Sequence, residues 1–330
     1  MTFSKMSLAF TACAITLACS SGPTEEEIAV RVDDFRQRSA QYFNTGSYQQ
    51  AFQQAHLGLE IATEEDGELN LLAGHALMMM RNRDDVASSQ KYLELASELL
   101  ESYRADLILG EFHQRYGSML HAHALRQRKS IASFPNSNEE QRADETAEND
   151  KRFATAQDHF QQATELFLVA LSQSPNDLHA LQLIGQSYAL LRQSANSRQH
   201  LNHALEILLE SRQYKNRVLA TDARMDLKQE TRLRGELLSD IEAEVAIRML
   251  VAGLDNIDRD IDAELAQYSH ILGLSPQSLN AVYGRAMCYY KLGNFALATK
   301  DLEYFISNTA LSFEHPQVRR AFEIIGETTN

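Results

Sequence analysis

The chain contains few of the residues that cross-link a fold or interrupt a helix. Its 330 residues include three cysteines, five prolines, 14 glycines and no tryptophan. Two of the cysteines lie near the start, so only Cys288 remains in the rest of the chain and no disulfide framework can form there. Because proline and glycine are scarce while Gln, Glu, Ala and Leu are abundant, the composition predicts an all-helical protein.

Positive charge and catalytic motifs are scarce as well. The 31 Lys and Arg residues are outnumbered by 45 Asp and Glu residues, and the net charge of −14 argues against binding to nucleic acid or to anionic lipid headgroups. The sequence has no G-x-S-x-G motif, no Walker loop, no H-E-x-x-H motif and no zinc-type pair of cysteines. We therefore expect no enzyme and no cofactor. An enzyme would need clustered titratable groups with shifted pKa values in a cavity.

The chain begins with an apolar run. Residues 6–19 carry no charge after Lys5, and the SSGPTEEE stretch that follows is small, polar and acidic. A membrane-spanning helix needs about 20 apolar residues, so this run is too short to cross a bilayer. A basic start, a short apolar stretch and an end of small residues predict a secretory signal peptide over residues 1–18, which is removed from the mature protein.

The end of this run, ITLAC (residues 15–19), resembles the lipobox of bacterial lipoproteins, with Ala18 before the cysteine. The resemblance implies that Cys19 carries a covalent lipid and anchors the chain to a membrane through a tether over residues 19–27. It also implies delivery to the periplasmic side of the outer membrane, because Ser20 and not aspartate follows the cysteine. In a host with one membrane, the anchor would hold the chain on its outer face. The alternative is ordinary cleavage after Ala18, with Cys19 an incidental thiol.

The clearest internal repeat spans residues 279–312 and consists of two amphipathic helical patterns joined by a turn at LGNF (residues 292–295). Small, aromatic and turn-forming residues occupy regular positions in it: Ala286, Tyr289, Gly293, Phe295, Ala298 and Leu302. The segment resembles the tetratricopeptide repeat, in which small residues allow two helices to pack closely and a glycine permits a tight turn. Cys288 lies inside this unit, where a small buried residue is expected, so we interpret it as core.

Further segments resemble the same family. Residues 245–278, with Pro276 near their end, form a degenerate copy without the turn glycine; residues 180–191 and the stretch before Pro175 belong to two others, and residues 35–61 to an N-terminal one. The two prolines lie 101 residues apart, close to three periods of about 34, so we expect the array to keep its phase between them. The resemblance implies an all-α, right-handed α-solenoid of stacked antiparallel helix pairs, closed by a C-terminal capping helix.

Two segments depart from the repeat pattern. Residues 135–151 are polar and acidic, and we interpret them as a solvated loop between N-terminal repeats (28–134) and C-terminal repeats with the cap (152–330). Residues 212–234 are locally basic, with an apolar stripe at helical spacing, which predicts a docking helix for an acidic partner or for the chain's own acidic loop. Its basic residues are Arg212, Lys215, Arg217, Arg224, Lys228, Arg232 and Arg234. The alternative is an ordinary exposed face, because acidic residues are interleaved with the bases.

The resemblance also implies a concave groove that is lined by the first helix of each pair and binds an extended peptide or a partner helix. It assigns to this groove a mixed polar and aromatic set: Arg36, Phe43, His179, Gln182, Gln186, Asn280, Tyr283, Met287, Tyr290 and Lys291. Tetratricopeptide co-chaperones hold a peptide carboxylate with a basic residue and an asparagine. Arg36 would serve as the base, but Ala40 stands where the asparagine is expected.

Three groups of side chains are of metal-binding type. His200 and His203 lie on one helical face, where side chains three apart can share a metal, and His121 and His123 are a second close pair, but no third ligand is apparent. Residues 78–80 are methionines, whose usual role is core packing. We therefore expect no metal site and interpret these residues as structural.

Together these patterns predict a membrane-anchored, protein-binding scaffold of the bacterial cell envelope. The partner would be a protein or peptide of a secretion, pilus, outer-membrane or cell-wall assembly, and the covalent lipid would be the only added group. This function is inferred from a fold that serves many unrelated binders. The alternative is a transporter-associated lipoprotein that binds a small molecule or a solute-binding protein, which predicts an enclosed cavity in the superhelix.

Overall fold

The structure, a computed structural model, describes residues 23–63, 65–80, 82–133, 139–221 and 225–329. The predicted signal peptide, the predicted lipid-attachment residue Cys19, and Arg224 lie outside the described residues. The described residues form α-helices joined by short turns, with no strand among them. The helices are α1 (Glu25–Asn44), α2 (Tyr48–Ile61), α3 (Gly67–Met79), α4 (Arg83–Leu100), α5 (Tyr103–Ser133), α6 (Glu139–Gln173), α7 (Leu178–Leu190), α8 (Ser194–Thr221), α9 (Leu227–Asp258), α10 (Ile261–Leu274), α11 (Leu279–Lys291), α12 (Phe295–Asn308) and α13 (Pro316–Thr329).

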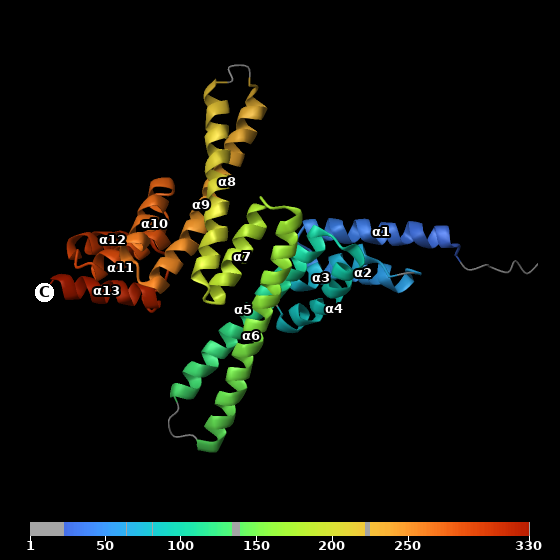
Figure 1. Cartoon of the computed structure of the whole chain (residues 1–330), viewed down its shortest axis with the longest axis horizontal. Helices are drawn as coiled ribbons and strands as arrows, with labels where there is room; N and C mark the ends of the chain where they lie inside the picture. The colour runs from blue at the N-terminus through green and yellow to red at the C-terminus, as the bar shows by residue number, and fades with distance from the viewer. Residues whose placement is uncertain (1–22, 64, 81, 134–138, 222–224, 330) are drawn as a thin grey trace, which may run out of the picture.

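Consecutive helices pack as antiparallel pairs, from α1–α2 to α11–α12, and each pair also packs on the next (Figure 1). The last helix, α13, packs on α12, and its buried Val318, Ala321 and Ile324 complete an apolar cluster with α11 and α12. The all-α solenoid of stacked helix pairs with a closing C-terminal helix is therefore confirmed. Among the described helices, none is both long and apolar enough to span a bilayer.

Small residues set the spacing between helices, as the repeat pattern predicts. Ala286 and Ala298 are fully buried, and so is Cys288, whose interpretation as core is confirmed. A Cβ atom on Gly284 would lie 2.3 Å from Cζ of Tyr268, so the α10–α11 contact depends on glycine at this position. These residues allow the helix axes to approach closely, and the burial that follows is the main favourable contribution to folding.

Several of the described turns within pairs use a left-handed residue. Gly46 and Gly293 have φ angles of 74° and 76°, in the region that glycine occupies without a steric penalty. In the degenerate unit around residues 245–278, Arg259 takes the equivalent position at φ 62°. A non-glycine residue in this region costs roughly 1–2 kcal/mol, so the missing glycine changes the local free energy but not the path of the chain.

The expectation that the repeats keep one 34-residue phase is wrong. Between Pro175 and Pro276 there are two helix pairs, α7–α8 and α9–α10, not three. The excess residues lengthen α8 and α9 to 28 and 32 residues, whereas the neighbouring α7 and α10 have 13 and 14. Two helix pairs that contain two long helices therefore give nearly the same spacing between the prolines as three regular repeats would.

The predicted acidic loop over residues 135–151 is also wrong for most of its length. Residues 139–151 begin the 35-residue helix α6, which runs antiparallel to α5; residues 134–138 lie outside the described part of the chain. Carboxylates near a helix N-terminus interact favourably with the helix dipole, and i,i+4 pairs such as Glu148–Arg152 (3.3 Å) support the helix. The segment is polar because it is exposed, and the two predicted halves are joined by a continuous hairpin.

The predicted docking segment over residues 212–234 is not one helix. It consists of the end of α8 and the start of α9, where Asp226 caps α9 by accepting a hydrogen bond from Gln229 N at 2.7 Å. The predicted tether is also shorter than expected, because α1 begins at Glu25 and Thr24 forms a capping box with Glu27.

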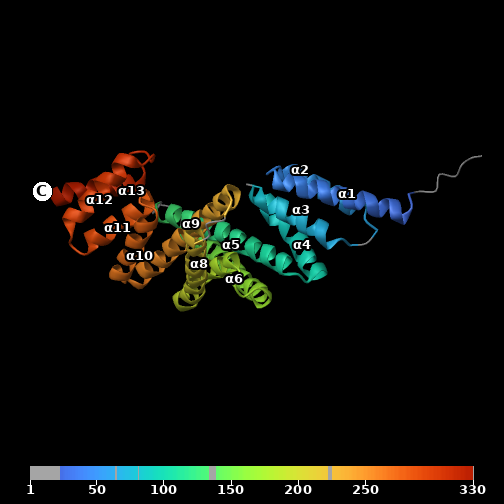
Figure 2. The ribbon, with the colours of Figure 1, turned by 90° about the horizontal axis from the view of Figure 1, so that it is seen from above.

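Two hairpins therefore project from the solenoid. We call residues 125–133 and 139–152 the α5–α6 arm, and residues 209–221 and 225–243 the α8–α9 arm. Figure 1 shows that the two arms point in opposite directions, across the long axis that runs from α1 to α13. Seen along the arms in Figure 2, the helix pairs α1–α4 lie at one end of the molecule and α10–α13 at the other.

Candidate protein-binding surfaces

The odd-numbered helices form an inner row. Helix α1 contacts α3, α3 contacts α5, α5 contacts α7 and α7 contacts α9, although a whole helix separates the members of each pair in sequence. Such contacts arise on the inside of a curved stack, where first helices come together. The inner row is thus the candidate binding face that the repeat resemblance predicts.

Aromatic rings join the first two helices of the inner row. Phe43 at the end of α1 lies with its ring centroid 4.3 Å from that of His75 on α3 and 5.3 Å from that of Tyr48 on α2. Burial lowers the pKa of His75 to about 4, so this imidazole is neutral at pH 7 and serves as part of an apolar surface. The repeat resemblance assigns Phe43 to this face. Nothing in the sequence around His75 indicates that His75 lies there too.

Polar side chains join α5 to α7 in the same row. His179 Nε2 lies 2.8 Å from Glu111 Oε1, and this hydrogen bond raises the pKa of His179. Gln114 donates to the carbonyl of Leu183 at 2.9 Å and to Ser187 Oγ at 3.1 Å. The predicted groove residues Gln182 and Gln186 are half-buried on the same helix, α7. Glu111 and Gln114 were missed by sequence reasoning because their partners lie on a helix that is distant in sequence.

Arg36 is not available as a carboxylate clamp. Its guanidinium donates to Asp33 at 2.7 Å and to Asp66, the N-cap of α3, also at 2.7 Å. Two carboxylates of the chain itself therefore occupy the groups that would hold a peptide C-terminus. The sequence already lacks the asparagine of the clamp, because Ala40 stands at its position. The internal pairing of Arg36 removes the basic residue of the clamp as well.

The groove residues predicted on α11 are mostly covered by the closing helix. Tyr283, Met287 and Tyr290 pack against the apolar cluster that α13 completes, and Tyr290 donates a hydrogen bond to Glu327 at 2.6 Å. Lys291 pairs with the buried Glu264 at 3.3 Å. Asn280 and Lys291 are exposed. The capping helix lies where the next first helix of an array would be, so Tyr283, Met287 and Tyr290 serve the cap and not an open groove.

The basic residues of the predicted docking segment differ in what they contact. Arg212 pairs with the fully buried Glu244, which also accepts from Arg248 at 2.8 Å and lies 3.0 Å from His270 Nε2. Burial by itself would raise the pKa of Glu244, but the guanidiniums of Arg248 and Arg212 outweigh it and lower that pKa below its ordinary value. Lys215 pairs with Asp240 at 2.7 Å. Arg212 and Lys215 are therefore structural.

Four described bases remain nearer the end of the α8–α9 arm. Arg234 pairs with Glu230 at 2.7 Å and Arg232 with Glu236 at 3.5 Å, both on the helix surface. Arg217 and Lys228 are exposed, and neither side chain has a hydrogen bond or an ion pair with any described residue. Among the basic residues that the structure describes in this arm, these two are open to a partner.

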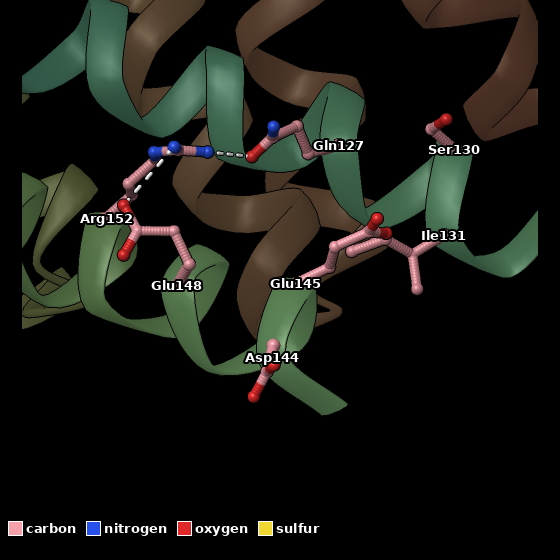
Figure 3. A pocket seen from close by; sticks show the side chains of 7 residues that line it. All are labelled: Gln127, Ser130, Ile131, Asp144, Glu145, Glu148 and Arg152. Atoms are coloured by element: carbon pink, nitrogen blue, oxygen red, sulfur yellow. Dashed lines mark hydrogen bonds and ion pairs between the residues drawn. The ribbon is translucent and has the colours of Figure 1, made fainter. Parts of the chain in front are cut away.

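A crevice of about 520 Å³ lies between α5 and α6 in the other arm (Figure 3). Its α6 side carries the carboxylates of Asp144, Glu145 and Glu148. Arg152, at its edge, donates to Gln127 and pairs with Glu148 at 3.3 Å. The remaining lining comes from α5, through Ser130 and Ile131 together with Gln127.

The histidines and methionines suspected of metal binding have other surroundings. His200 stacks on Tyr188 with centroids 5.6 Å apart, His121 contacts Phe153 at 5.3 Å, and Met78 is buried in the core. Within the described parts of the chain, no three metal-ligating side chains come together. The sequence did not indicate the pair of His113, which is buried, and His159, which is half-buried; their Nδ1 atoms lie 2.8 Å apart between α5 and α6.

Comparisons with known proteins give the fold. No family model and no curated protein matches the chain. Among solved structures, the APC/C hetero-tetramer Cut9–Hcn1 aligns at 12% identity over 93% of this chain and 46% of the other, with a TM-score of 0.50. A thermophilic tetratricopeptide protein of Thermus thermophilus aligns at 15% identity over 78% and 99% of the two chains (TM-score 0.40). A tetratricopeptide protein of Parabacteroides merdae aligns at 12% over 91% and 100% (TM-score 0.43). The chain folds as a tetratricopeptide-type α-solenoid.

Proposed function

We propose that this chain is a lipid-anchored scaffold of the bacterial cell envelope that binds a protein or peptide through the inner row of α1, α3, α5 and α7. The observation that carries the proposal is the continuity of this row. Polar and aromatic side chains from four helices, which are widely separated in the sequence, form one surface. Such a surface suits an extended partner that is recognised at several spaced points.

The geometry narrows the binding face relative to the sequence prediction. Tyr283, Met287 and Tyr290 pack against the cluster that α13 completes, Arg36 is held by two carboxylates, and the exposed Asn280 and Lys291 lie on α11, outside the row of α1, α3, α5 and α7. The predicted groove residues that remain on this row are Phe43, His179, Gln182 and Gln186. His75, Glu111 and Gln114 join them. The expected partner therefore contacts the N-terminal half of the solenoid.

The ITLAC segment supports the membrane anchor, because a cysteine at the end of a signal peptide is the attachment point of bacterial lipoproteins. Six residues, 19–24, separate the attachment point from α1, so the tether reaches at most about 20 Å. The solenoid would thus begin close to the membrane, with α1 as its nearest helix.

The anchor is tested by metabolic labelling with an alkyne fatty acid. We expect the wild-type chain to carry the label and to sediment with membranes, and the Cys19→Ser variant to lose both properties. Cys13→Ser is the matched control and should retain both. A wild-type chain without label would refute the lipid anchor and leave ordinary cleavage after Ala18.

The binding face is tested by photo-crosslinking in cells. A photoreactive amino acid at Phe43 or Gln182, both on the inner row, should give a crosslink to the same partner. At Glu206, an exposed residue of α8 on the outer side, it should not. Equal crosslinking from all three positions would show that the inner row is not the preferred surface.

A ligand-carrying accessory of a transporter predicts an enclosed lumen. Among the described residues, crevices of about 320–520 Å³ lie between neighbouring helices, and one of about 660 Å³ lies along the start of α1. We therefore give preference to the protein-binding scaffold.

A further inference from the structure

A crevice of about 320 Å³ lies where the α5–α6 hairpin leaves the solenoid and meets the end of α7. Its volume is at the lower end of the roughly 300–1,000 Å³ that is typical of small-molecule sites. It is separate from the crevice of Figure 3, since the two share no lining residue. Three segments contribute side chains: His121, Leu125 and Arg128 from α5, Asp150, Phe153, Gln157 and Phe160 from α6, and Leu190 and Arg192 from the end of α7 and the turn after it.

The deeper part of the crevice is aromatic. Phe160 is 1% exposed, and the ring centroid of His121 lies 6.3 Å from that of Phe160 and 5.3 Å from that of Phe153. Leu125 and Leu190 are 43% and 38% exposed, so apolar surface continues to the opening. A flat ring packs against aromatic neighbours in edge-to-face or offset geometry and gains more than its buried area alone supplies. The crevice therefore suits an aromatic group.

Three polar side chains of the lining are free to bind a ligand. The side chains of His121, Gln157 and Arg192 make no hydrogen bond or ion pair with any residue that the structure describes. Asp150, in contrast, pairs with Arg128 at 3.5 Å, and the guanidinium of Arg128 lies 5.0 Å from the ring centroid of Phe153. With Asp150 offset by Arg128, the free charge at the crevice is the guanidinium of Arg192. The crevice is thus locally positive in a chain of net charge −14.

Arg192 occupies a turn position that favours glycine. Its φ angle is 59°, and the turns after α1 and α11 have Gly46 and Gly293 at 74° and 76°. A side chain strains the backbone in this conformation, whereas glycine does not. Arginine in this turn places at the crevice a planar set of donors that matches the geometry of a carboxylate. Arg259 has the same conformation after α9 but does not line this crevice, so it provides a matched control.

We propose that this crevice binds a small aromatic carboxylate, with its ring against Phe153 and Phe160 and its carboxylate on Arg192. An aromatic amine would meet the free positive charge of Arg192 and would find Asp150 already paired. A carboxylate without a ring would leave the aromatic surface uncovered. The free amide of Gln157 supplies a further donor. The inference does not depend on the proposed anchor or on the inner-row partner.

Fluorine NMR with 4-fluorophenylacetate and the chain over residues 20–330 tests the site. We expect the fluorine signal to broaden in a saturable manner, with a dissociation constant in the millimolar range or tighter. Excess phenylacetate should reverse the broadening, and excess acetate should not. The amine 2-(4-fluorophenyl)ethylamine has a similar size and the opposite charge, so it should bind far more weakly.

Substitutions locate the binding. Arg192→Gln removes the charge that pairs with the carboxylate and should weaken binding about tenfold or more, whereas Arg259→Gln should leave it unchanged. Phe153→Leu removes a ring contact and should weaken binding by a factor on the order of three to ten. Asp150→Asn should act in the opposite direction and tighten binding, because it removes a negative charge and frees Arg128. A gain of affinity cannot result from a loss of folding.

Three results would overturn the inference. The broadening of 4-fluorophenylacetate could fail to saturate, the amine could bind as tightly as the carboxylate, or Arg192→Gln and Arg259→Gln could have equal effects. A failure of the inner-row crosslinks would not bear on it, since Phe43 and Gln182 do not line this crevice.

Discussion

The α5–α6 and α8–α9 hairpins leave the solenoid as pairs of helices of 28–35 residues, about twice the length of α10, α11 and α12. They nevertheless join the solenoid through different interactions. The α5–α6 base is apolar and closely packed, whereas the α8–α9 base contains a buried carboxylate held by basic side chains. The same shape is thus stabilised by two different kinds of contact.

At the α5–α6 base, glycines on one helix receive aromatic rings from the other. A Cβ atom on Gly110 would lie 2.5 Å from the ring of Phe167, and one on Gly117 would lie 2.9 Å from that of Phe160. Both rings are almost completely buried. Dispersion contacts and the removal of apolar surface from water hold this base, so it depends on shape and little on charge.

At the α8–α9 base, Glu244 accepts from Arg212 of α8 and from Arg248 of its own helix and lies beside His270 of α10, so that one carboxylate ties three helices together. Removing two charges from water is costly, and a buried pair of this kind adds little net stability. Breaking it is costly all the same, because the partner charges remain buried. The comparison teaches that the α5–α6 base relies on rings packed against glycines, whereas the α8–α9 base adds a buried carboxylate, which specifies its partners, to an apolar contact that includes Leu208 and Ile247.

The largest expected effect is on the apolar base. Phe160→Ala removes a fully buried ring and should lower the free energy of unfolding by about 3–5 kcal/mol. Urea unfolding followed by circular dichroism measures the loss, and hydrogen exchange should locate it in α5 and α6. Phe322→Ala, at a 45% exposed position on α13, is the control and should cost far less. Equal losses for the two variants would contradict the apolar base.

The next effect is on the ionic base. Glu244→Gln leaves Arg212 and Arg248 buried without their counter-charge and should cost about 3 kcal/mol. Glu230→Gln, which removes the surface partner of Arg234 on the same helix, should cost less than about 1 kcal/mol. If both substitutions prove equally mild in urea unfolding, the α8–α9 base is not held by Glu244.

Acidification should separate the two bases. Burial, with a smaller effect of the neighbouring His159, lowers the pKa of His113 at the α5–α6 base from 6.5 to about 4. Because the unfolded chain binds this proton more readily, stability is fully present above pH 6.5 and is lost as the pH falls toward 4, by roughly 2 kcal/mol at pH 5. Burial alone would raise the pKa of Glu244, but Arg248 and Arg212 lower it, which opposes protonation of this carboxylate as the pH falls.

Hydrogen exchange at pH 7 and pH 5, corrected for intrinsic rates, measures this difference. Protection should fall at the base of α5 and α6 before it falls at the base of α8 and α9. The variant His113→Gln keeps a hydrogen-bonding side chain without titrating in this range, and its α5–α6 base should respond less to pH. A simultaneous loss in both hairpins would mean that another group controls the response.

The smallest expected change in stability comes from replacing a glycine by alanine, once in each hairpin. Gly110→Ala forces a Cβ atom against the buried ring of Phe167 and should destabilise by about 1–3 kcal/mol. Gly235→Ala, within α9 and with no atom within 4 Å of the new Cβ, should stabilise by about 1 kcal/mol, because alanine favours a helix over glycine. Thermal unfolding should therefore shift in opposite directions. Shifts of the same sign would show that the α8–α9 arm is packed.

The repeat units were predictable because their signals are local. The closely spaced Ala286, Gly293 and Ala298 define a helix, a turn and a second helix that pack on each other, and the structure confirms each role. The polar segment over residues 139–151 was interpreted wrongly because local composition was the only signal available. An exposed helix and a solvated loop share a composition, so residues 139–151 could not be assigned from polarity alone.

The candidate surfaces were only partly predictable. Phe43, Gln182 and Gln186 lie on the inner row, as the repeat resemblance implies. Arg36 and Tyr290 have internal partners at Asp66 and Glu327, which lie 30 and 37 residues away. No periodicity in the sequence records such a pairing, because it depends on where separate helices come to lie.

The sequence by itself determined the helix pairs, their tight turns and the small residues between them, since each depends on neighbours within one or two helical turns or one hairpin. Only the tertiary structure decided that α5–α6 and α8–α9 project as arms in opposite directions, that α13 covers α11, and that Glu244 joins three helices. The physical reason is that helix formation is a local property of the chain. The partner of a buried charge or of an apolar face is fixed by the stacking of all the helices together.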